Sequence, residues 1–359
     1  MNLFLAVIAG IYLIWIIWLW TYLQKTPWFE TQKTNLVSKF SIIIPFKNEA
    51  ENLPQLLDSL QKLDYAASHF EIILIDDHSV DDSLKIVENQ PNIKLYNNLG
   101  SGKKQALQTG ITQAQNEWVV SIDADCEVSP NYLQTLNAFI LQKQPEMILG
   151  PVRYFDSKHF LGQFQQFEFL CLQALTMASA AYQKPFLANG ANLIFRKQSF
   201  EAVGGYDGNM NMASGDDVFL LQKFVHKFPD KIHFIKSLSA IVKTQAAQSL
   251  TELIQQKIRW AGKSKTQSPV VAKVTGIMML FFHLALIYAL LTLPVNYGFV
   301  VVKFLADGLC LYQVNRFYRA KLIWWFYPLA FVVYPFYLIV IFVLALKGTY
   351  RWKGDIYKQ

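Results

Sequence analysis

The chain has few cysteines, and their spacing excludes the cysteine-based classes of small protein. Cys126, Cys171 and Cys310 are the three cysteines among 359 residues. An odd number at wide spacing fits neither a disulfide framework nor a zinc site. A reducing compartment for the soluble part of the chain is therefore the simpler expectation.

A glycine-rich phosphate loop is missing as well. A dinucleotide oxidoreductase needs G-x-G-x-x-G directly after its first strand, and this chain has Pro45-Phe46-Lys47-Asn48 there. No basic stripe with interleaved aromatic residues is present, so the net charge of +7 does not indicate a nucleic-acid-binding protein. The charge fits a protein that lies on an anionic membrane face.

Charge is absent from residues 2–23, which are apolar and aromatic and long enough to span a bilayer. The chain as a whole is 53% hydrophobic, with a mean hydropathy of +0.21, which is high for a soluble protein. No basic residue precedes the segment, so we expect a retained anchor rather than a signal peptide. Lys25, Lys33 and Lys39 follow it, and the positive-inside rule places the next domain in the cytoplasm.

The C-terminal part contains three apolar runs, Pro269–Leu293, Val295–Val314 and Leu322–Leu346. In the second run, Lys303 and Asp307 are four residues apart and are expected to pair on one helix face. Two basic clusters flank the third run, and both favour the cytoplasm. They consist of Arg316, Arg319 and Lys321, and of Lys347, Arg351, Lys353 and Lys358. Either the third run is a re-entrant hairpin broken near Pro328 and Pro335, or the middle run does not cross.

Residues 40–152 alternate strand-like and helix-like patterns. Phe40–Pro45 is apolar apart from Ser41, as is typical of a strand buried on both faces, and Glu51–Leu63 carries leucines at helical spacing. The alternation continues through Phe70–Asp76, a short helix from Asp81, Asn92–Tyr96, Lys103–Ala114 and Glu117–Ile122. This order predicts an α/β domain with a mostly parallel sheet and right-handed crossovers.

A further apolar stretch, Phe160–Tyr182, carries Phe160, Phe164, Phe167 and Cys171 at helical spacing. Such a helix can belong to the core or lie at a membrane interface, and both interpretations stay open.

Carboxylates follow two of the predicted strands. Asp76 and Asp77 close the second strand, and Asp123 and Asp125 follow the fourth. Ligands of open α/β sheets bind at the carboxyl ends of the strands. Like charges repel, so a fold has little structural reason to gather carboxylates there. Their oxygens suit a divalent metal and the polar parts of a nucleotide.

Five motifs occur in order along the chain: Ser41–Glu49, Asp76–Ser79, Asp123–Asp125, Gly215–Asp217 and Gln256–Trp260. Each motif alone is weak, but five in order at plausible spacing resemble a membrane-bound family 2 glycosyltransferase with a GT-A fold. Some members of that family are processive synthases and others are lipid glycosyltransferases. The resemblance covers roughly residues 38–262, and the flanking apolar segments are also typical of such enzymes.

The resemblance implies that the loop after the first strand lines the uridine pocket through Pro45, Asn48 and Glu49. It assigns Asp77 to the base or ribose of the nucleotide, and His78 stands where the family usually has Gly. An acidic helix start and a turn carboxylate would explain the same residues without a ligand.

Three residues are expected at the diphosphate. Lys103 would offset its charge, although a solvated basic helix start is an equally good interpretation. Asp123 and Asp125, two apart on an extended segment, point the same way. One of these two carboxylates would hold a metal, and both Asp125 and Asp123 are candidate ligands. Asp123 is also expected to approach the ribose of the nucleotide-sugar. Mg²⁺ or Mn²⁺ prefers such oxygen ligands and is the expected cofactor.

Gly215-Asp216-Asp217 precedes an apolar helix, and helix capping would explain its carboxylates. By resemblance, Asp217 takes the position of the general base, and Asp216 stands where the family usually has Glu. Gly190-Ala191-Asn192 and Gly204–Asp207 are turn-rich, and they either form the acceptor side or serve loop geometry only.

Gln256, Arg259 and Trp260 lie on a predicted helix, Leu250–Gly262, and share one face. Arg259 can bind diphosphate oxygens bidentately, and Trp260 can stack on a sugar or rest at the bilayer interface. An amphipathic helix that leads into the first C-terminal span is the alternative interpretation. We expect both to hold, and assign these three residues to catalysis with Asp217.

The expected function is inverting transfer of a sugar from a nucleotide-sugar, with UDP as the expected nucleotide, to a lipid or lipid-linked acceptor. The enzyme would be a hexosyltransferase in the cell (inner) membrane with its catalytic domain in the cytoplasm. Its partners would be the donor, a lipid or glycan acceptor and the membrane, without nucleic acid. Two alternatives are a processive polysaccharide synthase, for which three C-terminal runs are few, and a non-catalytic membrane scaffold, which the retained Asp123, Asp125 and Asp217 disfavour.

The expected architecture is a GT-A cytoplasmic domain, Rossmann-like with a mostly parallel mixed sheet, between one N-terminal and two to three C-terminal transmembrane helices. The predicted segments are 1–24 for the anchor, 38–245 for the GT-A domain, 246–266 for the interfacial helix, 268–347 for the transmembrane region and 348–359 for the basic tail.

Overall fold

The computed structural model describes residues 1–31, 34–88, 90–209, 215–262, 270–346, 349–352 and 355–358. The predictions on Lys33, Lys347 and Lys353 lie outside these residues. The chain divides into two units. The sheet unit comprises Pro27–Tyr154 and Ser179–Gln245, and the membrane unit comprises Met1–Thr26, Phe155–Ala178 and Ala246–Gln359.

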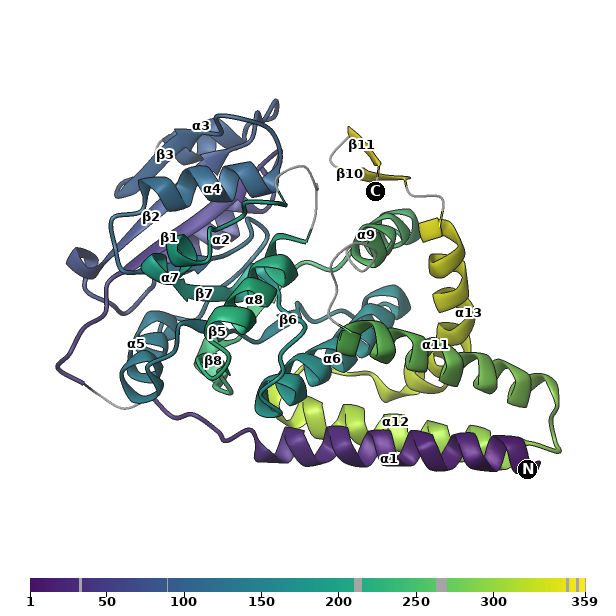
Figure 1. The fold of residues 1–359 in the computed structure, drawn as a ribbon. Helices are drawn as coiled ribbons and strands as arrows, with labels where there is room; N and C mark the ends of the chain where they lie inside the picture. Colours follow the sequence, from purple (N-terminus) through teal and green to yellow (C-terminus); the bar gives the residue numbers. More distant parts are fainter. Residues whose placement is uncertain are drawn as a thin grey trace. The chain divides into compact units, whose positions relative to one another are not determined.

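The sheet unit is built on a seven-stranded sheet in the order β3-β2-β1-β4-β7-β5-β8 (Figure 1). Its strands are β1 Phe40–Phe46, β2 Phe70–Asp76, β3 Ile93–Asn97, β4 Trp118–Ser121, β5 Met147–Leu149, β7 Leu193–Arg196 and β8 Ile232–Phe234. β3, β2, β1 and β4 are parallel, β7 runs antiparallel to both of its neighbours, and β5 pairs parallel with β8. The predicted mostly parallel mixed sheet is confirmed.

β1 lies where the order of the strands in the sheet changes direction. All seven β1 residues are buried, because β2 flanks the strand on one side and β4 on the other. The chain leaves β1 towards β2 but returns from β3 to the far side of β1. At such a switch in strand order the loops after the two central strands diverge, which leaves room for a ligand.

Helices and short 3₁₀ turns connect these strands. The helices are α2 Leu53–Gln61, α3 Ser83–Glu88, α4 Lys103–Gln113, α5 Tyr132–Lys143, α7 Lys197–Ala202 and α8 Asp216–Lys227. The 3₁₀ turns are η1 Ala67–His69, η2 Gly190–Asn192 and η3 Leu238–Ala240. α4 packs on β1 and β2, and a side chain at Gly110 would meet Ile43 and Ile75 there. A second, small sheet pairs β6 Val152–Tyr154 with β9 Val242–Thr244.

The membrane unit consists mainly of helices. These are α1 Leu3–Lys25, α6 Phe160–Ala181 (whose last three residues belong to the sheet unit), α9 Leu250–Gly262, α11 Val270–Leu291, α12 Tyr297–Tyr318, η4 Trp324–Phe326 and α13 Tyr327–Leu346. Four segments are long and apolar enough to cross a membrane: Leu3–Lys25, Val270–Leu291, Tyr297–Tyr318 and Trp324–Leu346. A short hairpin, β10 Thr349–Trp352 and β11 Asp355–Lys358, follows.

α1 lies alongside α12, and a polar cluster joins the two helices (Figure 1). The predicted pair of Lys303 and Asp307 is present at 2.8 Å, and the Tyr12 hydroxyl donates to Asp307. The Lys303 ammonium also lies 4.5 Å from the centre of the Tyr12 ring. A charged pair in an apolar helix is therefore neutralised within the bundle, as such residues generally are.

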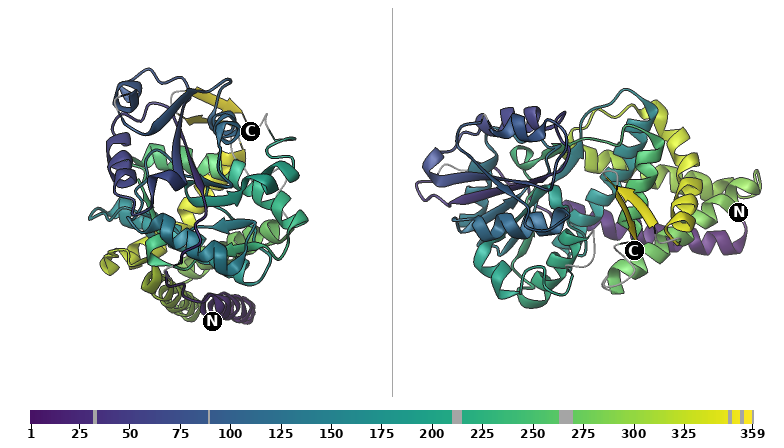
Figure 2. Two further views of the ribbon diagram at one scale, coloured as in Figure 1. Left: turned by 90° about the vertical axis from the view of Figure 1, so that its left-hand side faces the viewer. Right: turned by 90° about the horizontal axis from the view of Figure 1, so that it is seen from above.

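The prediction of a broken hairpin at Leu322–Leu346 is wrong. α13 is one continuous helix with Pro335 inside it, and it is steeply inclined to α1, α11 and α12 (Figures 1 and 2). The alternative that the middle run does not cross finds no support either, because α12 lies along α1. For Phe160–Tyr182 the core interpretation holds for Phe164 and Phe167, which are buried.

Candidate functional site

The loop after β1 is held against the loop after β2. The Asn48 N–H donates to Ser79 Oγ at 3.0 Å, and the Glu49 N–H donates to Ser83 Oγ at 2.8 Å. Asn48 has a positive φ of 53°, and its side-chain oxygen accepts from the Val80 N–H. Pro45 itself is a buried residue of β1. The predicted nucleotide loop is thus fixed by hydrogen bonds before any ligand arrives.

Asp77 ties this region to the start of α4. Its buried carboxylate accepts the Gly102 N–H at 2.9 Å and the Asn98 side-chain amide at 2.6 Å. The neighbouring His78 has a φ of +62°, a conformation that glycine adopts most easily. Its imidazole bonds the Gly100 carbonyl at 2.7 Å. His78 therefore has a backbone conformation typical of glycine. Its side chain adds a contact between the loop after β2 and the loop after β3.

The segment after β4 is not extended, so the predicted geometry of Asp123 and Asp125 is wrong. A turn closes from the Cys126 N–H to the Asp123 carbonyl at 3.2 Å, because the chain reverses directly after the strand. The two carboxylates nevertheless remain close. Burial, then the charge of Asp123 and then that of Glu49 raise the pKa of Asp125 to about 6. Asp125 thus lies within electrostatic range of Asp123, which follows β4 with it, and of Glu49, which follows β1.

Lys103 joins this acidic group from the N-terminus of α4. Its ammonium forms an ion pair with Asp123, and both side chains are partly exposed. The alternative interpretation of Lys103 as a solvated helix start is therefore incomplete, because its ammonium pairs with Asp123. Its predicted role at the diphosphate stays a prediction.

Gly190, in η2, lies where the acidic turn meets the predicted base. A Cβ at Gly190 would stand 3.3 Å from Asp216 Oδ2, 3.7 Å from Lys103 Nζ and 3.8 Å from Asp217 Cβ. The Gly190 backbone is thus a common neighbour of the lysine that pairs with Asp123 and of the two carboxylates that open α8. We call Lys103, Asp123, Gly190, Asp216 and Asp217 the Gly190 cluster.

Asp217 is oriented by backbone groups. One of its oxygens accepts the Gly190 N–H at 3.3 Å and the other accepts the Val218 N–H at 2.8 Å. The Gly190 carbonyl in turn accepts from Ser121 Oγ at 2.9 Å. Asp217 lies in the first turn of α8, where the positive end of the helix dipole attracts negative charge. A buried carboxylate oriented in this way can take a proton from a hydroxyl.

Sequence reasoning missed Ser121 and Asn98, which orient other groups of the site. Neither belongs to a motif, and only their positions at the ends of β4 and β3 could have indicated them. Asn192 serves loop geometry rather than ligand binding. Its amide donates to the Pro151 and Ala240 carbonyls, and its oxygen accepts from Tyr132.

Gln256, Arg259 and Trp260 belong to the membrane unit, on α9 as predicted. The centre of the Trp260 ring lies 6.3 Å from the centre of the Phe169 ring on α6. The Lys257 ammonium lies 4.0 Å from the centre of the Trp260 ring. Lys257 pairs at 2.6 Å with Glu168, and both side chains are buried. Burial lowers the pKa of Lys257, which the charge of Glu168 opposes. The role of these residues towards the Gly190 cluster stays a prediction.

The acidic turn fits a divalent cation with few protein ligands. Among the described residues there is no group of three or more His, Cys, Asp or Glu side chains arranged to hold a metal. Mg²⁺ is commonly bound through one or two carboxylates plus substrate phosphates. Asp125 and Asp123 supply such carboxylates. Burial contributes most to the raised pKa of Asp125, and the charges of Asp123 and Glu49, which a cation would offset, contribute less.

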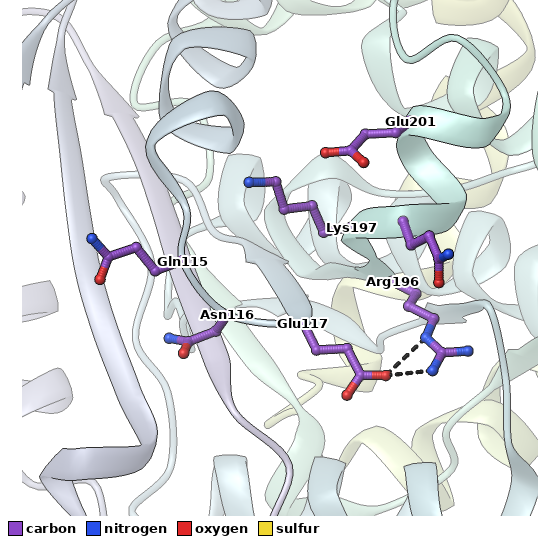
Figure 3. A pocket seen from close by; sticks show the side chains of 7 residues that line it. Gln115, Asn116, Glu117, Arg196, Lys197 and Glu201 are labelled. Atoms are coloured by element: carbon purple, nitrogen blue, oxygen red, sulfur yellow. Dashed lines mark hydrogen bonds and ion pairs between the residues drawn. The ribbon is translucent and has the colours of Figure 1, made fainter.

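A separate pocket of about 500 Å³ lies at the opposite end of β4. Residues just before β4, at the end of β7 and in α7 line it: Gln115, Asn116, Glu117, Arg196, Lys197, Gln198 and Glu201. Figure 3 shows Arg196 paired with Glu117, with a shortest distance of 2.6 Å. None of the predicted site residues lines this pocket, so it is not the predicted donor site.

The fold and the site together define the class. Residues 41–204 match the family described as Glycosyl transferase family 2. This chain therefore carries a family 2 glycosyltransferase domain with a GT-A fold, and its four long apolar helices make it a membrane protein.

A solved structure of a mannosyltransferase from Pyrobaculum calidifontis, in complex with GDP-mannose and Mn²⁺, has a similar fold along nearly the whole chain. The TM-score is 0.59 at 20% identity, and the match covers 95% of this chain and 99% of that one.

Curated relatives match over shorter stretches. The poly(ribitol-phosphate) β-N-acetylglucosaminyltransferase of Staphylococcus aureus is 34% identical over 31% of this chain and 20% of its own length. The undecaprenyl-phosphate 4-deoxy-4-formamido-L-arabinose transferase of Proteus mirabilis is 34% identical over 28% of this chain and 33% of its own length. The poly-β-1,6-N-acetyl-D-glucosamine synthase of Staphylococcus epidermidis is 26% identical over 63% of this chain and 54% of its own length. The matches thus span between a fifth and about half of these relatives.

Proposed function

We propose that this protein transfers a sugar from a nucleotide-sugar, with UDP as the expected nucleotide, to a lipid or lipid-linked acceptor, with inversion at the anomeric carbon. The reaction would take place at the cytoplasmic face of the cell (inner) membrane. The observation that carries the proposal is the Gly190 cluster, in which an oriented carboxylate, Asp217, and a lysine paired to Asp123 share one backbone neighbour.

In the proposed reaction, Asp217 accepts the proton of the acceptor hydroxyl. The acceptor oxygen then bonds to the anomeric carbon, while the bond from that carbon to the diphosphate breaks and its electron pair leaves with the diphosphate. Lys103 offsets the charge of the departing group. Asn48, Glu49 and Asp77, with Pro45, line the nucleotide side.

Asp125 and Asp123 would hold Mg²⁺ or Mn²⁺, which neutralises diphosphate charge when bound. The mannosyltransferase structure that contains Mn²⁺ supports the use of a divalent metal. Arg259, with Gln256 and Trp260, is proposed to act on the diphosphate and acceptor from α9.

Polymer synthesis is the second candidate, favoured by the match to the poly-β-1,6-N-acetyl-D-glucosamine synthase. The match to an undecaprenyl-phosphate sugar transferase favours a lipid acceptor. The four described apolar helices are few for a polymer channel, so a lipid or lipid-linked acceptor remains the proposal.

The test is turnover of a panel of UDP-sugars by the protein in native membranes, with Mn²⁺, with Mg²⁺ and with a chelator. We expect metal-dependent UDP release from one sugar, with label in an extractable lipid. Label in material too large to extract would favour the polymerase. Absence of turnover with every UDP-sugar would contradict UDP as the nucleotide.

A further inference from the structure

His78 joins two loops that follow neighbouring strands of the sheet unit. β2 and β3 pair side by side, and His78 lies in the loop after β2. Its Nε2 lies 2.7 Å from the carbonyl oxygen of Gly100, in the loop after β3. A carbonyl oxygen only accepts hydrogen bonds, so Nε2 carries the proton in this contact. The imidazole thus fixes the distance between two loops that the chain connects only through α3 and β3.

The backbone conformation at His78 is unfavourable for a residue with a side chain. Its φ of +62° lies in the left-handed region, which glycine enters freely and other residues do not. The ring is exposed, so burial of apolar surface does not offset this cost. The hydrogen bond to Gly100 offsets part of it. A histidine at this position is therefore explained by what its ring holds and not by the shape of the turn.

The loop after β3 is coupled to the first turn of α4. The Ser101 N–H donates to Gln105 Oε1 at 2.7 Å, and a Cβ at Gly100 would overlap the same oxygen. The Gly102 N–H donates to both oxygens of Asp77, at 2.9 and 3.0 Å. The segment from Gly100 to Gly102 therefore moves together with the start of α4.

Lys103 follows this segment directly, as the first residue of α4. Its ammonium pairs with Asp123, and its Nζ belongs to the Gly190 cluster. A displacement at Gly100 would shift the Lys103 backbone and redirect its side chain. His78 is thus placed to set the position of Lys103, although it lies outside the Gly190 cluster itself.

We propose that His78 is a positioning residue for the donor. By holding the Gly100 carbonyl, it keeps the Lys103 ammonium where it meets the diphosphate of the nucleotide-sugar. This inference rests on the proposed glycosyl transfer, in which Lys103 offsets the charge of the diphosphate. The contribution of His78 is confined to the diphosphate, so a nucleoside without phosphate binds equally well with and without it.

The first test measures UDP and uridine binding to His78→Gly in the full-length protein at fixed Mg²⁺. Calorimetry gives the Kd of UDP, and displacement of UDP gives that of uridine. We expect the UDP Kd to rise about five-fold, the size of one hydrogen bond's contribution, and the uridine Kd to stay within about two-fold. An unchanged UDP Kd would overturn the inference. An equal rise for both ligands would also overturn it, because His78 would then act on the nucleoside side.

Two variants control this comparison. Asn92→Gly also places glycine at an exposed residue with positive φ, 64°, but at the opposite end of β3. We expect both of its Kd values within about two-fold of the unmodified protein. His78→Gln keeps a side-chain N–H donor and is expected to restore most of the UDP affinity that His78→Gly loses. UDP binding as weak in His78→Gln as in His78→Gly would count against the hydrogen bond to Gly100.

A double-mutant cycle with Lys103→Met tests whether His78 acts through the lysine. In the Lys103→Met background we expect His78→Gly to change the UDP Kd less than about two-fold, because the group that His78 positions is gone. The same five-fold rise in both backgrounds would overturn the inference. Sugar transfer by the unmodified protein is the separate control. Transfer with an unchanged UDP Kd in His78→Gly removes this inference alone, whereas absence of both UDP binding and transfer refutes the proposed function as well.

Discussion

Gly190 allows three charged side chains to approach one backbone position. Asp216, Asp217 and Lys103 all lie within 4 Å of where its Cβ would be, and its N–H orients Asp217. The sequence indicated Asp217, Lys103 and the Asp123–Asp125 pair through their motifs. It could not indicate that Gly190 and Ser121 join them, because backbone groups that approach in space leave no mark in a motif.

We predict that Gly190→Ala slows transfer by about ten- to a hundred-fold. Its methyl group would stand 3.3 Å from Asp216 Oδ2 and disturb the adjacent Asp217, and misplacement by about 1 Å can cost that much. The measurement is kcat for transfer at saturating donor. Gly276→Ala is the matched control, because its Cβ would meet nothing within 4 Å. Equal kcat values for the two variants would contradict the assignment.

At the scale of elements, the sequence predicted most helices and strands to within a few residues. β2 and α9 have the predicted bounds, because a buried apolar run and an amphipathic period are strong local signals. The apolar run Leu322–Leu346 indicated α13, but its prolines suggested a break that the structure does not have. An apolar helix tolerates proline when neighbouring groups form hydrogen bonds with the backbone groups that the proline leaves unpaired. The tilt of a helix is set by its packing against other helices and is not encoded in an apolar run.

An ion pair between Lys257 and Glu168, at 2.6 Å, links α9 to α6. We predict that Glu168→Gln lowers the free energy of unfolding by about 3 kcal/mol, because it leaves the buried Lys257 ammonium without its counter-charge. The measurement is the unfolding midpoint of the detergent-solubilised protein. The double variant Glu168→Met with Lys257→Met is the control and is expected to recover most of the loss. A Glu168→Gln midpoint equal to that of the unmodified protein would contradict a stabilising pair.

At the scale of the whole molecule, two basic clusters flank the third C-terminal apolar run, and both favour the cytoplasm. The arrangement of the membrane unit bears on how both can lie on that side. The linker between α12 and α13 contacts the segment before α6, where the Lys321 N–H donates to Asp156 at 3.0 Å. β10 packs on α9. At the other end of the bundle, the Met1 amino group donates to the Val295 carbonyl at 3.0 Å. The inclination of α13 thus lets the linker and the tail hairpin lie on one side.

We predict that the tail and the α12–α13 linker face the same side of the membrane, which the positive-inside rule makes the cytoplasm. The measurement is labelling of single cysteines at Lys358→Cys and Arg319→Cys in sealed vesicles, in a background without the native cysteines. Val295→Cys is the control for the opposite side. Labelling of Lys358→Cys together with Val295→Cys would show that α13 crosses the membrane.

The central claim is that Asp217 removes the acceptor proton in a glycosyl-transfer site. The most direct measurement compares donor binding and transfer in Asp217→Asn, which keeps the size of the side chain and removes its basicity. We predict donor affinity within about two-fold of the unmodified protein and a loss of transfer of at least about a hundred-fold, in line with the contribution of a general base. Near-normal transfer by Asp217→Asn would remove Asp217 from the mechanism and contradict the account.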